Sequence, residues 1–257
     1  MTLAFDITKS QGKYTLSTFE SKARSTVPYF VYLPPNWNPN SNYRLILFLH
    51  GQGGDEGTFK KYVAAQQLNE WILTGKIPNI VIAGIRGDED KDNIQWFTEA
   101  NEALLSPNGE FIQFCRDHFK AGGEREGVSI EGHSRGGGGA LHYMFKYPNG
   151  FKSVISMGYV SDYTLAENKD LALKNKTALI GSGVQLFMEI GTEDQYVRNK
   201  NRKASFLMHD FLTTLKIPHT FNHLFGVEHG FDSFWNHYSD EGMHNGLLHL
   251  KRHCKGL

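Results

Sequence analysis

Residues 128–139 read VSIEGHSRGGGG and carry the strongest structural signal in the chain. An apolar strand pattern ends at His133 and a helical pattern starts at Gly136, so Ser134 stands at a strand-to-helix turn inside a G-x-S-x-G motif. Glycine is required at Gly132 and Gly136, because the serine backbone is strained and a side chain there would strike a neighbouring strand or helix. We predict that Ser134 is a nucleophile at a helix N-terminus, where the helix dipole favours negative charge. The alternative is a glycine-rich turn with an incidental serine.

Apolar runs and helical patterns alternate along the rest of the chain. Runs typical of strands occur at residues 30–33, 44–51, 79–86, 128–133, 151–158, 185–191 and 220–225. Helical patterns occur at residues 59–73, 110–119, 136–147 and 202–215. Strands that alternate with helices imply right-handed crossovers. We expect a three-layer α/β sandwich, formed by a single domain over residues 1–257, with a mostly parallel sheet and helices on both of its faces.

The composition excludes several classes of function. Lys and Arg together number 27, as do Asp and Glu, so the formal net charge is zero and no general field attracts nucleic acid. Hydrophobic residues make up 40% of the chain, which is enough for a packed core, while the longest apolar runs fall far short of the ~20 residues that a membrane span needs. We expect a soluble globular protein with no nucleic-acid partner and no membrane partner.

The N-terminal residues and the cysteines add two expectations. Residues 1–19 lack the basic start and continuous apolar segment of a secretory signal, so the cytoplasm is the default location, although a trimmed secreted form would read the same. Cys115 and Cys254 are the only cysteines, too few for a disulfide framework or a metal site. We expect both to be ordinary buried or half-buried residues.

A glycine-rich segment, His50-Gly-Gln-Gly-Gly54, directly follows the apolar run at 45–49. The carboxyl ends of the strands are where such sheets carry their chemistry. An acyl-transfer enzyme needs two N–H donors for its tetrahedral oxyanion, and we predict the backbone amides of Gln52 and Arg135 as this oxyanion hole. A turn that is rich in glycine for geometry alone is the alternative. We expect His50 to brace the loop rather than to act as a base.

Two further loops supply an acid and a base. Asp194 lies on the loop that follows the run at 185–191. It carries a short, rigid carboxylate of the kind that orients an imidazole. Its neighbour Glu193 is the alternative acid, and we expect Glu193 to cap the following helix or turn. Among 12 histidines, His229 lies on a glycine-flanked loop after the last predicted strand, whereas His223 lies within that strand and is the weaker candidate. The order Ser134, Asp194, His229 is that of the α/β-hydrolases.

The remaining histidines raise a metal hypothesis that the spacing does not support. His249 and His253 are four residues apart and share one face of the last predicted helix. A third ligand of defined spacing is missing, so we expect a packed or solvated pair and no metal ion or cofactor.

The chain resembles the esterase D family of α/β-hydrolases over about residues 25–250. This family includes feruloyl and acetyl-xylan esterases, tributyrin-type carboxylesterases and S-formylglutathione hydrolases. The resemblance is carried, in order, by the segments at residues 30–38, 45–55, 75–85, 127–142, 147–158, 187–195 and 226–235. It implies an α/β-hydrolase fold with Ser134 as nucleophile, Asp194 as acid and His229 as base. It also implies the amides of Gln52 and Arg135 as the oxyanion hole.

Departures from the family pattern bear on the substrate. Arg135 stands where family elbows commonly have methionine, which predicts a cation at the rim of the acyl pocket. Residues 53–55 lack the cysteine that usually follows the oxyanion loop in S-formylglutathione hydrolases, so that branch is disfavoured. Residues 161–183 are long enough to cap the site partly, but no apolar lid is evident, and an esterase is favoured over a lipase.

Together these features predict a serine carboxylesterase that hydrolyses short-chain or aryl (feruloyl-type) esters through an acyl-enzyme. Its partner would be a small-molecule ester or an esterified carbohydrate. An acyltransferase, a peptidase and an inactive binding protein of the same fold are the alternatives. We also predict an aromatic rim that binds substrate, formed by Trp96, Phe97 and Phe231, whereas Trp235 is as readily a core residue.

Overall fold

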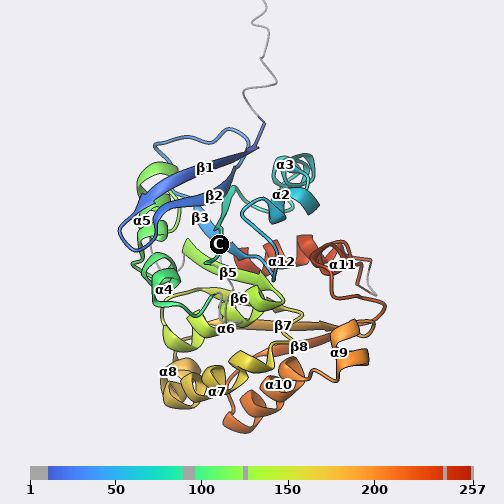
Figure 1. Cartoon of the computed structure of the whole chain (residues 1–257). Helices are drawn as coiled ribbons and strands as arrows, with labels where there is room; N and C mark the ends of the chain where they lie inside the picture. Colours follow the sequence, from blue (N-terminus) through green and yellow to red (C-terminus); the bar gives the residue numbers. More distant parts are fainter. Residues whose placement is uncertain (1–10, 89–95, 124–126, 240–241, 256–257) are drawn as a thin grey trace, which may run out of the picture.

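The eight strands of the described residues form one mixed sheet (Figure 1). The computed structural model describes residues 11–88, 96–123, 127–239 and 242–255. The strand order is β1-β2-β4-β3-β5-β6-β7-β8. Strand β2 pairs antiparallel with both of its neighbours, β1 and β4, and all pairs from β4 to β8 are parallel. The strands are β1 (Lys13–Ser21), β2 (Ser25–Leu33), β3 (Arg44–Leu49), β4 (Ile80–Ile85), β5 (Val128–His133), β6 (Ser153–Met157), β7 (Gln185–Gly191) and β8 (Thr220–Leu224).

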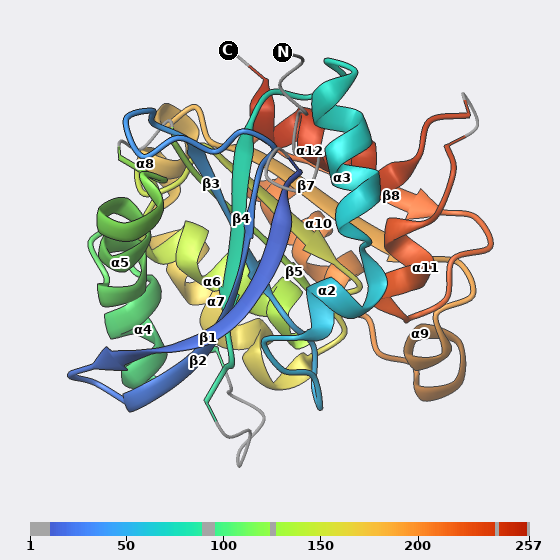
Figure 2. The same cartoon turned by 90° about the horizontal axis from the view of Figure 1, so that it is seen from above.

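Helices cover both faces of this sheet, as predicted (Figure 2). One face is covered by α4 (Glu99–Leu105), α5 (Glu110–Phe119), α6 (Arg135–Lys146), α7 (Leu165–Lys174), α8 (Lys176–Gly181) and α10 (Ala204–Leu215). The other is covered by α2 (Thr58–Tyr62), α3 (Ala65–Leu73), α11 (Phe231–Trp235) and α12 (Asn245–Cys254). The short helix α9 (Gln195–Lys200) follows β7.

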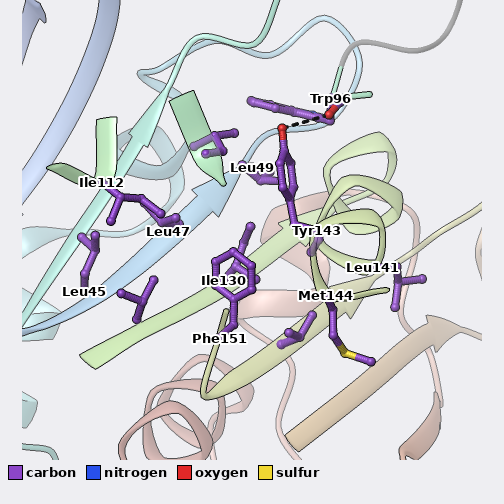
Figure 3. Packing of buried hydrophobic residues seen from close by; sticks show 14 of the residues in the cluster. Leu45, Leu47, Leu49, Trp96, Ile112, Ile130, Leu141, Tyr143, Met144 and Phe151 are labelled. Atoms are coloured by element: carbon purple, nitrogen blue, oxygen red, sulfur yellow. Dashed lines mark hydrogen bonds between the residues drawn. The ribbon is translucent and has the colours of Figure 1, made fainter. Parts of the chain in front are cut away.

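The apolar runs of the central strands are explained by burial on both faces. In β3, Leu45, Leu47 and Leu49 pack into the core on the α6 side, shown in Figure 3, while Ile46 and Phe48 pack on the α11 and α12 side. Successive side chains of a strand point to opposite faces, so a strand with helices on both sides is apolar at most of its positions.

Two elements differ from the sequence predictions. The helical pattern over 59–73 is divided into α2 and α3, because the chain is extended at Val63 and Ala64. Strand β1 was not predicted. It pairs along its length with β2 at the edge of the sheet, and most of its side chains are exposed and polar, so it lacks a strong apolar pattern.

The segment 161–183 forms a layer of the fold rather than a lid. Helices α7 and α8 pack beside α6, where the Asn168 and Asn175 amides donate hydrogen bonds to the carbonyls of Gly138 and Phe145. Cys115 and Cys254 are both buried and not disulfide-bonded. Within the described ranges, no helix has the length and apolar character to span a bilayer.

Candidate active site

Ser134 occupies the strained turn between β5 and α6 that the motif predicted. Its backbone has φ 56° and ψ −113°, and its amide donates a 2.8 Å hydrogen bond to the Met157 carbonyl. A Cβ at Gly132 would overlap the Gly136 carbonyl, and one at Gly136 would overlap the Leu49 carbonyl. Both glycines are therefore required by close backbone approach, and the turn presents Ser134 beyond the carboxyl end of β5.

Ser134, His229 and Asp194 form a continuous hydrogen-bonded chain. His229 Nδ1 donates to Asp194 Oδ2 at 2.6 Å, and this proton leaves Nε2 as the acceptor for the Ser134 hydroxyl at 2.8 Å. Asp194 is fully buried, and only about a tenth of each of the other two residues is exposed. The arrangement allows the imidazole to take the hydroxyl proton while the carboxylate stabilises the imidazolium.

The loops after β7 and β8 pack tightly, which brings Asp194 to His229. The Glu193 amide donates to the Val227 carbonyl at 3.0 Å, and the Thr192 amide donates to the Leu224 carbonyl at 2.9 Å. Gly191 allows this approach, because a Cβ there would overlap the Val227 carbonyl. Residues 35 positions apart in the sequence thus meet at one edge of the sheet.

The capping role expected of Glu193 belongs to Asp194 instead. Asp194 Oδ1 accepts a 2.9 Å hydrogen bond from the Tyr196 amide at the start of α9, while Oδ2 bonds to His229. Glu193 points away and pairs with the exposed guanidinium of Arg198. Both oxygens of Asp194 are therefore fixed, which sets the orientation of the carboxylate against the imidazole.

Two rings beside His229 were missed by the sequence analysis. His133 lies next to Ser134 on β5, and its Nε2 donates to the His229 carbonyl. Burial, together with the nearby His229, lowers the pKa of His133 to about 3, so it is neutral and holds the His229 backbone. The Tyr196 ring lies 4.5 Å from the His229 ring. The intervening position of the G-x-S-x-G motif is the only sequence signal for His133, and none marks Tyr196.

The glycine-rich loop after β3 forms a tight turn beside Ser134. The Gly54 amide donates to the Gly51 carbonyl at 3.1 Å, with Gly53 at φ 70° in the position that requires glycine. His50 braces this loop as expected, since Nδ1 donates to the Gly51 carbonyl at 2.8 Å and Nε2 accepts from the Gly87 amide at 3.0 Å. The Gln52 amide takes no part in the hydrogen bond between Gly54 and Gly51 that closes this turn.

A pocket of about 910 Å³ opens over Ser134 and His229. Gln52, Arg135 and Phe231, all predicted site residues, contribute to its lining. Val160, Ser161 and Tyr163 also line it, so only the start of segment 161–183 reaches the site. A volume of this size accommodates a small-molecule ester.

Trp96 and Phe97 do not belong to the predicted aromatic rim. Trp96 is only 1% exposed, and Figure 3 shows it in the core with the Tyr143 hydroxyl donating to its carbonyl. Its Nε1 donates to the His50 carbonyl at 3.0 Å, so it supports the loop after β3 from below. Phe97 packs against His142, and Trp235 is a fully buried core residue. Packing against distant residues, rather than position in the chain, determines whether these rings reach the pocket.

His249 and His253 lie in a buried charge cluster on the other side of β5 from α6. His249 Nε2 donates to Glu189 at 2.9 Å, and His253 Nε2 lies 3.3 Å from Glu131. Burial would lower the pKa of His249, but Glu189 and Glu131 outweigh it and raise this pKa to about 9. Arg252 also bonds Glu189 at 2.7 Å. The pair is packed against carboxylates that hold α12 to the sheet.

Comparison with known proteins gives a consistent result. A model of the family named Esterase and described as "Putative esterase" matches residues 22–237. A ferulic acid esterase superposes with a TM-score of 0.71 at 19% identity, covering 86% of this chain and 92% of its own. An S-formylglutathione hydrolase from Staphylococcus aureus gives 0.70 at 16% identity, covering 94% and 97%. A feruloyl esterase module from Clostridium thermocellum, complexed with sinapinate, gives 0.63 at 18% identity, covering 95% and 87%. The α/β-hydrolase fold is thereby confirmed.

Proposed function

We propose, because this chain belongs to the Esterase family, that it is a serine carboxylesterase acting on short-chain or aryl esters through an acyl-enzyme. The observation that carries the proposal is the hydrogen-bonded chain from Ser134 Oγ through His229 to Asp194, with distances of 2.8 and 2.6 Å. Such a chain activates a serine hydroxyl that is otherwise a weak nucleophile.

The proposed reaction begins when Ser134 Oγ attacks the ester carbonyl and His229 Nε2 takes its proton. The oxyanion that forms accepts hydrogen bonds from the backbone amides of Gln52 and Arg135. His229 then gives the proton to the leaving alcohol. A water molecule, deprotonated by the same imidazole, then attacks the acyl-enzyme carbonyl. The bond between the acyl carbon and Ser134 Oγ breaks, His229 returns the proton to Ser134 Oγ, and the acid is released. Asp194 keeps the proton on His229 Nδ1 throughout the cycle.

Aryl esters are included in the proposal for two reasons. Phe231 lies mostly in the core, but its 4% exposed surface lines the pocket two residues after His229 and is the apolar contact we propose for an aryl group. One structurally similar protein, the Clostridium thermocellum module, is described as complexed with sinapinate, which is an aryl acid. A panel of p-nitrophenyl acetate, butyrate and octanoate, methyl ferulate and acetylated xylan would rank the acyl groups.

Replacement of the nucleophile tests the proposal directly. We expect Ser134→Ala to keep its circular dichroism spectrum and to lose at least ~10³-fold in kcat on p-nitrophenyl butyrate, as in other triads. Ser161→Ala is the matched control, because Ser161 lines the same pocket without a hydrogen bond to His229. A fluorophosphonate probe should label the wild-type protein and Ser161→Ala but not Ser134→Ala. Substantial turnover by Ser134→Ala, or failure of the folded wild type to label, would refute the assignment.

A further inference from the structure

One wall of the pocket over Ser134 is basic. Arg135 from the start of α6, Lys200 from the end of α9 and Arg202 just beyond it all contribute to the pocket lining. The chain turns back between the last two residues at Asn201, which adopts φ 49°. Three cations from two separate segments of the chain therefore line one pocket in a protein whose formal net charge is zero.

Aromatic rings hold two of these cations in place. The Arg202 guanidinium lies 5.7 Å from the centre of the Tyr163 ring and 5.9 Å from that of Tyr196. Lys200 Nζ lies 4.6 Å from the centre of the Tyr196 ring. Contact with a ring face fixes a cation while leaving the N–H groups at its edge available to a ligand.

The two guanidinium groups of this wall are close enough to repel each other. Burial, and after it the positive charge of Arg202, lower the pKa of Arg135 from its ordinary value. Both residues are only partly exposed, so water screens this repulsion less than it would at an open surface. An anion bound between the two groups would relieve the repulsion and gain charge-assisted hydrogen bonds.

Within the part of the chain that the structure describes, no carboxylate pairs with Lys200 or Arg202 of this wall. Glu193, in the same segment, is engaged by Arg198. Two acidic residues do line the pocket, Asp55 and Asp232, but they come from the loop before α2 and from α11. Asp55 lies 3.9 Å from Arg86, and Lys61 adds a fourth cation to the lining.

We infer that Arg135, Lys200 and Arg202 form a subsite that binds an anionic group of the ester substrate, a carboxylate or a phosphate. The inference rests on the proposed esterase function and adds the substrate class: esters that carry a negative charge away from the scissile bond. Arg202 is the specificity-determining residue, because its guanidinium is held between two rings and offers paired N–H donors to the oxygens of such a group.

Matched pairs of esters test the inference. Monomethyl succinate and dimethyl succinate place or remove the charge on the acyl side, and 4-acetoxybenzoate and its methyl ester do so on the alcohol side. A phosphate is tested with 4-acetoxyphenyl phosphate. We expect kcat/KM to favour the anionic member of at least one pair, and ~0.5 M NaCl to reduce this preference by screening.

Substitutions identify the residue responsible. We expect Arg202→Gln to reduce the anionic-to-neutral ratio of kcat/KM by about tenfold, which is the size of a charge-assisted pair, and Arg202→Lys to restore part of it. Lys174→Gln is the control, because it removes the same charge from an exposed position on α7 that does not line the pocket. A ratio that is the same in wild type, Arg202→Gln and Lys174→Gln overturns the inference.

A binding measurement separates this inference from the esterase proposal. Calorimetry on the Ser134→Ala variant compares monomethyl succinate, 4-acetoxybenzoate and 4-acetoxyphenyl phosphate with their uncharged counterparts, and needs no turnover. Tighter binding of an anionic ester, lost in the Ser134→Ala, Arg202→Gln double variant, supports the subsite even if no ester is hydrolysed. Binding without any preference for charge refutes it, even if the wild-type protein proves to be an active esterase.

Discussion

Raising the pH from 7.5 to 8.5 should lower the free energy of unfolding by about 1 kcal/mol, and His249 is the cause. The carboxylates of Glu189 and Glu131 overcome the effect of burial and raise the pKa of His249 to about 9. A histidine in the unfolded chain has a pKa of about 6.5. Because the folded pKa is the higher one, the stabilisation is complete below pH ~6.5 and is lost as the pH rises through ~9.

The structure sets the size of the effect. The difference between about 9 and about 6.5, at 1.36 kcal/mol per pH unit, corresponds to about 3 kcal/mol in total. Between pH ~7.5 and ~8.5 the folded protein keeps most of the proton that the unfolded chain has released, so the slope approaches one proton. Histidines with a lowered pKa, such as His133 and His142, change the free energy of unfolding only below about pH 6.5. Burial also raises the pKa values of the Cys115 and Cys254 thiols, which adds a smaller loss of stability in the same direction as the pH approaches about 8.5.

Urea unfolding at pH 7.5, 8.0 and 8.5, followed by tryptophan fluorescence, measures this slope. The Trp235 ring lies 6.1 Å from the His249 ring and reports on this part of the core. The His249→Gln variant should lose most of this dependence of the unfolding free energy on pH, even if the variant is less stable at every pH. The control His223→Gln changes an exposed histidine on β8 and should keep the wild-type dependence. Equal slopes in the wild type and His249→Gln would refute the charge assignment.

Three further predictions concern the elbow, the core and the acid. Gly136→Ala should lower the free energy of unfolding by about 3 kcal/mol in urea melts, since its Cβ would overlap the Leu49 carbonyl, while Gly181→Ala, which meets no atom within 4 Å, should not destabilise the protein. Trp96→Ala should cost about 3–5 kcal/mol and reduce turnover of aryl and acetyl esters equally; a selective rise in KM for methyl ferulate would return Trp96 to the substrate site. Asp194→Asn should lower kcat on p-nitrophenyl butyrate by about 10⁴-fold at a nearly unchanged melting temperature, because an amide oxygen still caps α9 but the imidazole tautomer is wrong; kcat within tenfold of wild type would exclude Asp194 as the acid.

The hydrogen-bonded chain of the candidate site was predictable because local patterns mark each member. Ser134 is set by glycines whose need is steric, and Asp194 and His229 each follow a strand whose end lies at the same edge of the sheet. The apolar runs identified the central strands for an equally local reason, since burial on both faces leaves few polar positions.

Features that depend on distant partners were not predictable. Whether an aromatic ring such as Trp96 faces substrate or core depends on packing with residues far along the chain. The spacing of His249 and His253 predicts a shared face, but it does not reveal that Glu131 on β5 and Glu189 on β7 lie opposite. Similarly, the approach of Arg202 to Arg135 brings together the segment after α9 and the start of α6, which no local pattern signals.

The buried charge cluster between the sheet and α12 can be completed only when the C-terminal helix has been synthesised. Glu131 lies three positions before Ser134, and Glu189 lies on β7, yet the side chains of His249, Arg252 and His253 that face these carboxylates all belong to α12. While α12 is still inside the ribosome, β5 and β7 cannot bury two ionised carboxylates without their cations. The nascent chain therefore exposes Ser134 early but completes the packing of β5 late, so we expect the hydrogen-bonded site to become ordered only after α12 has emerged and docked.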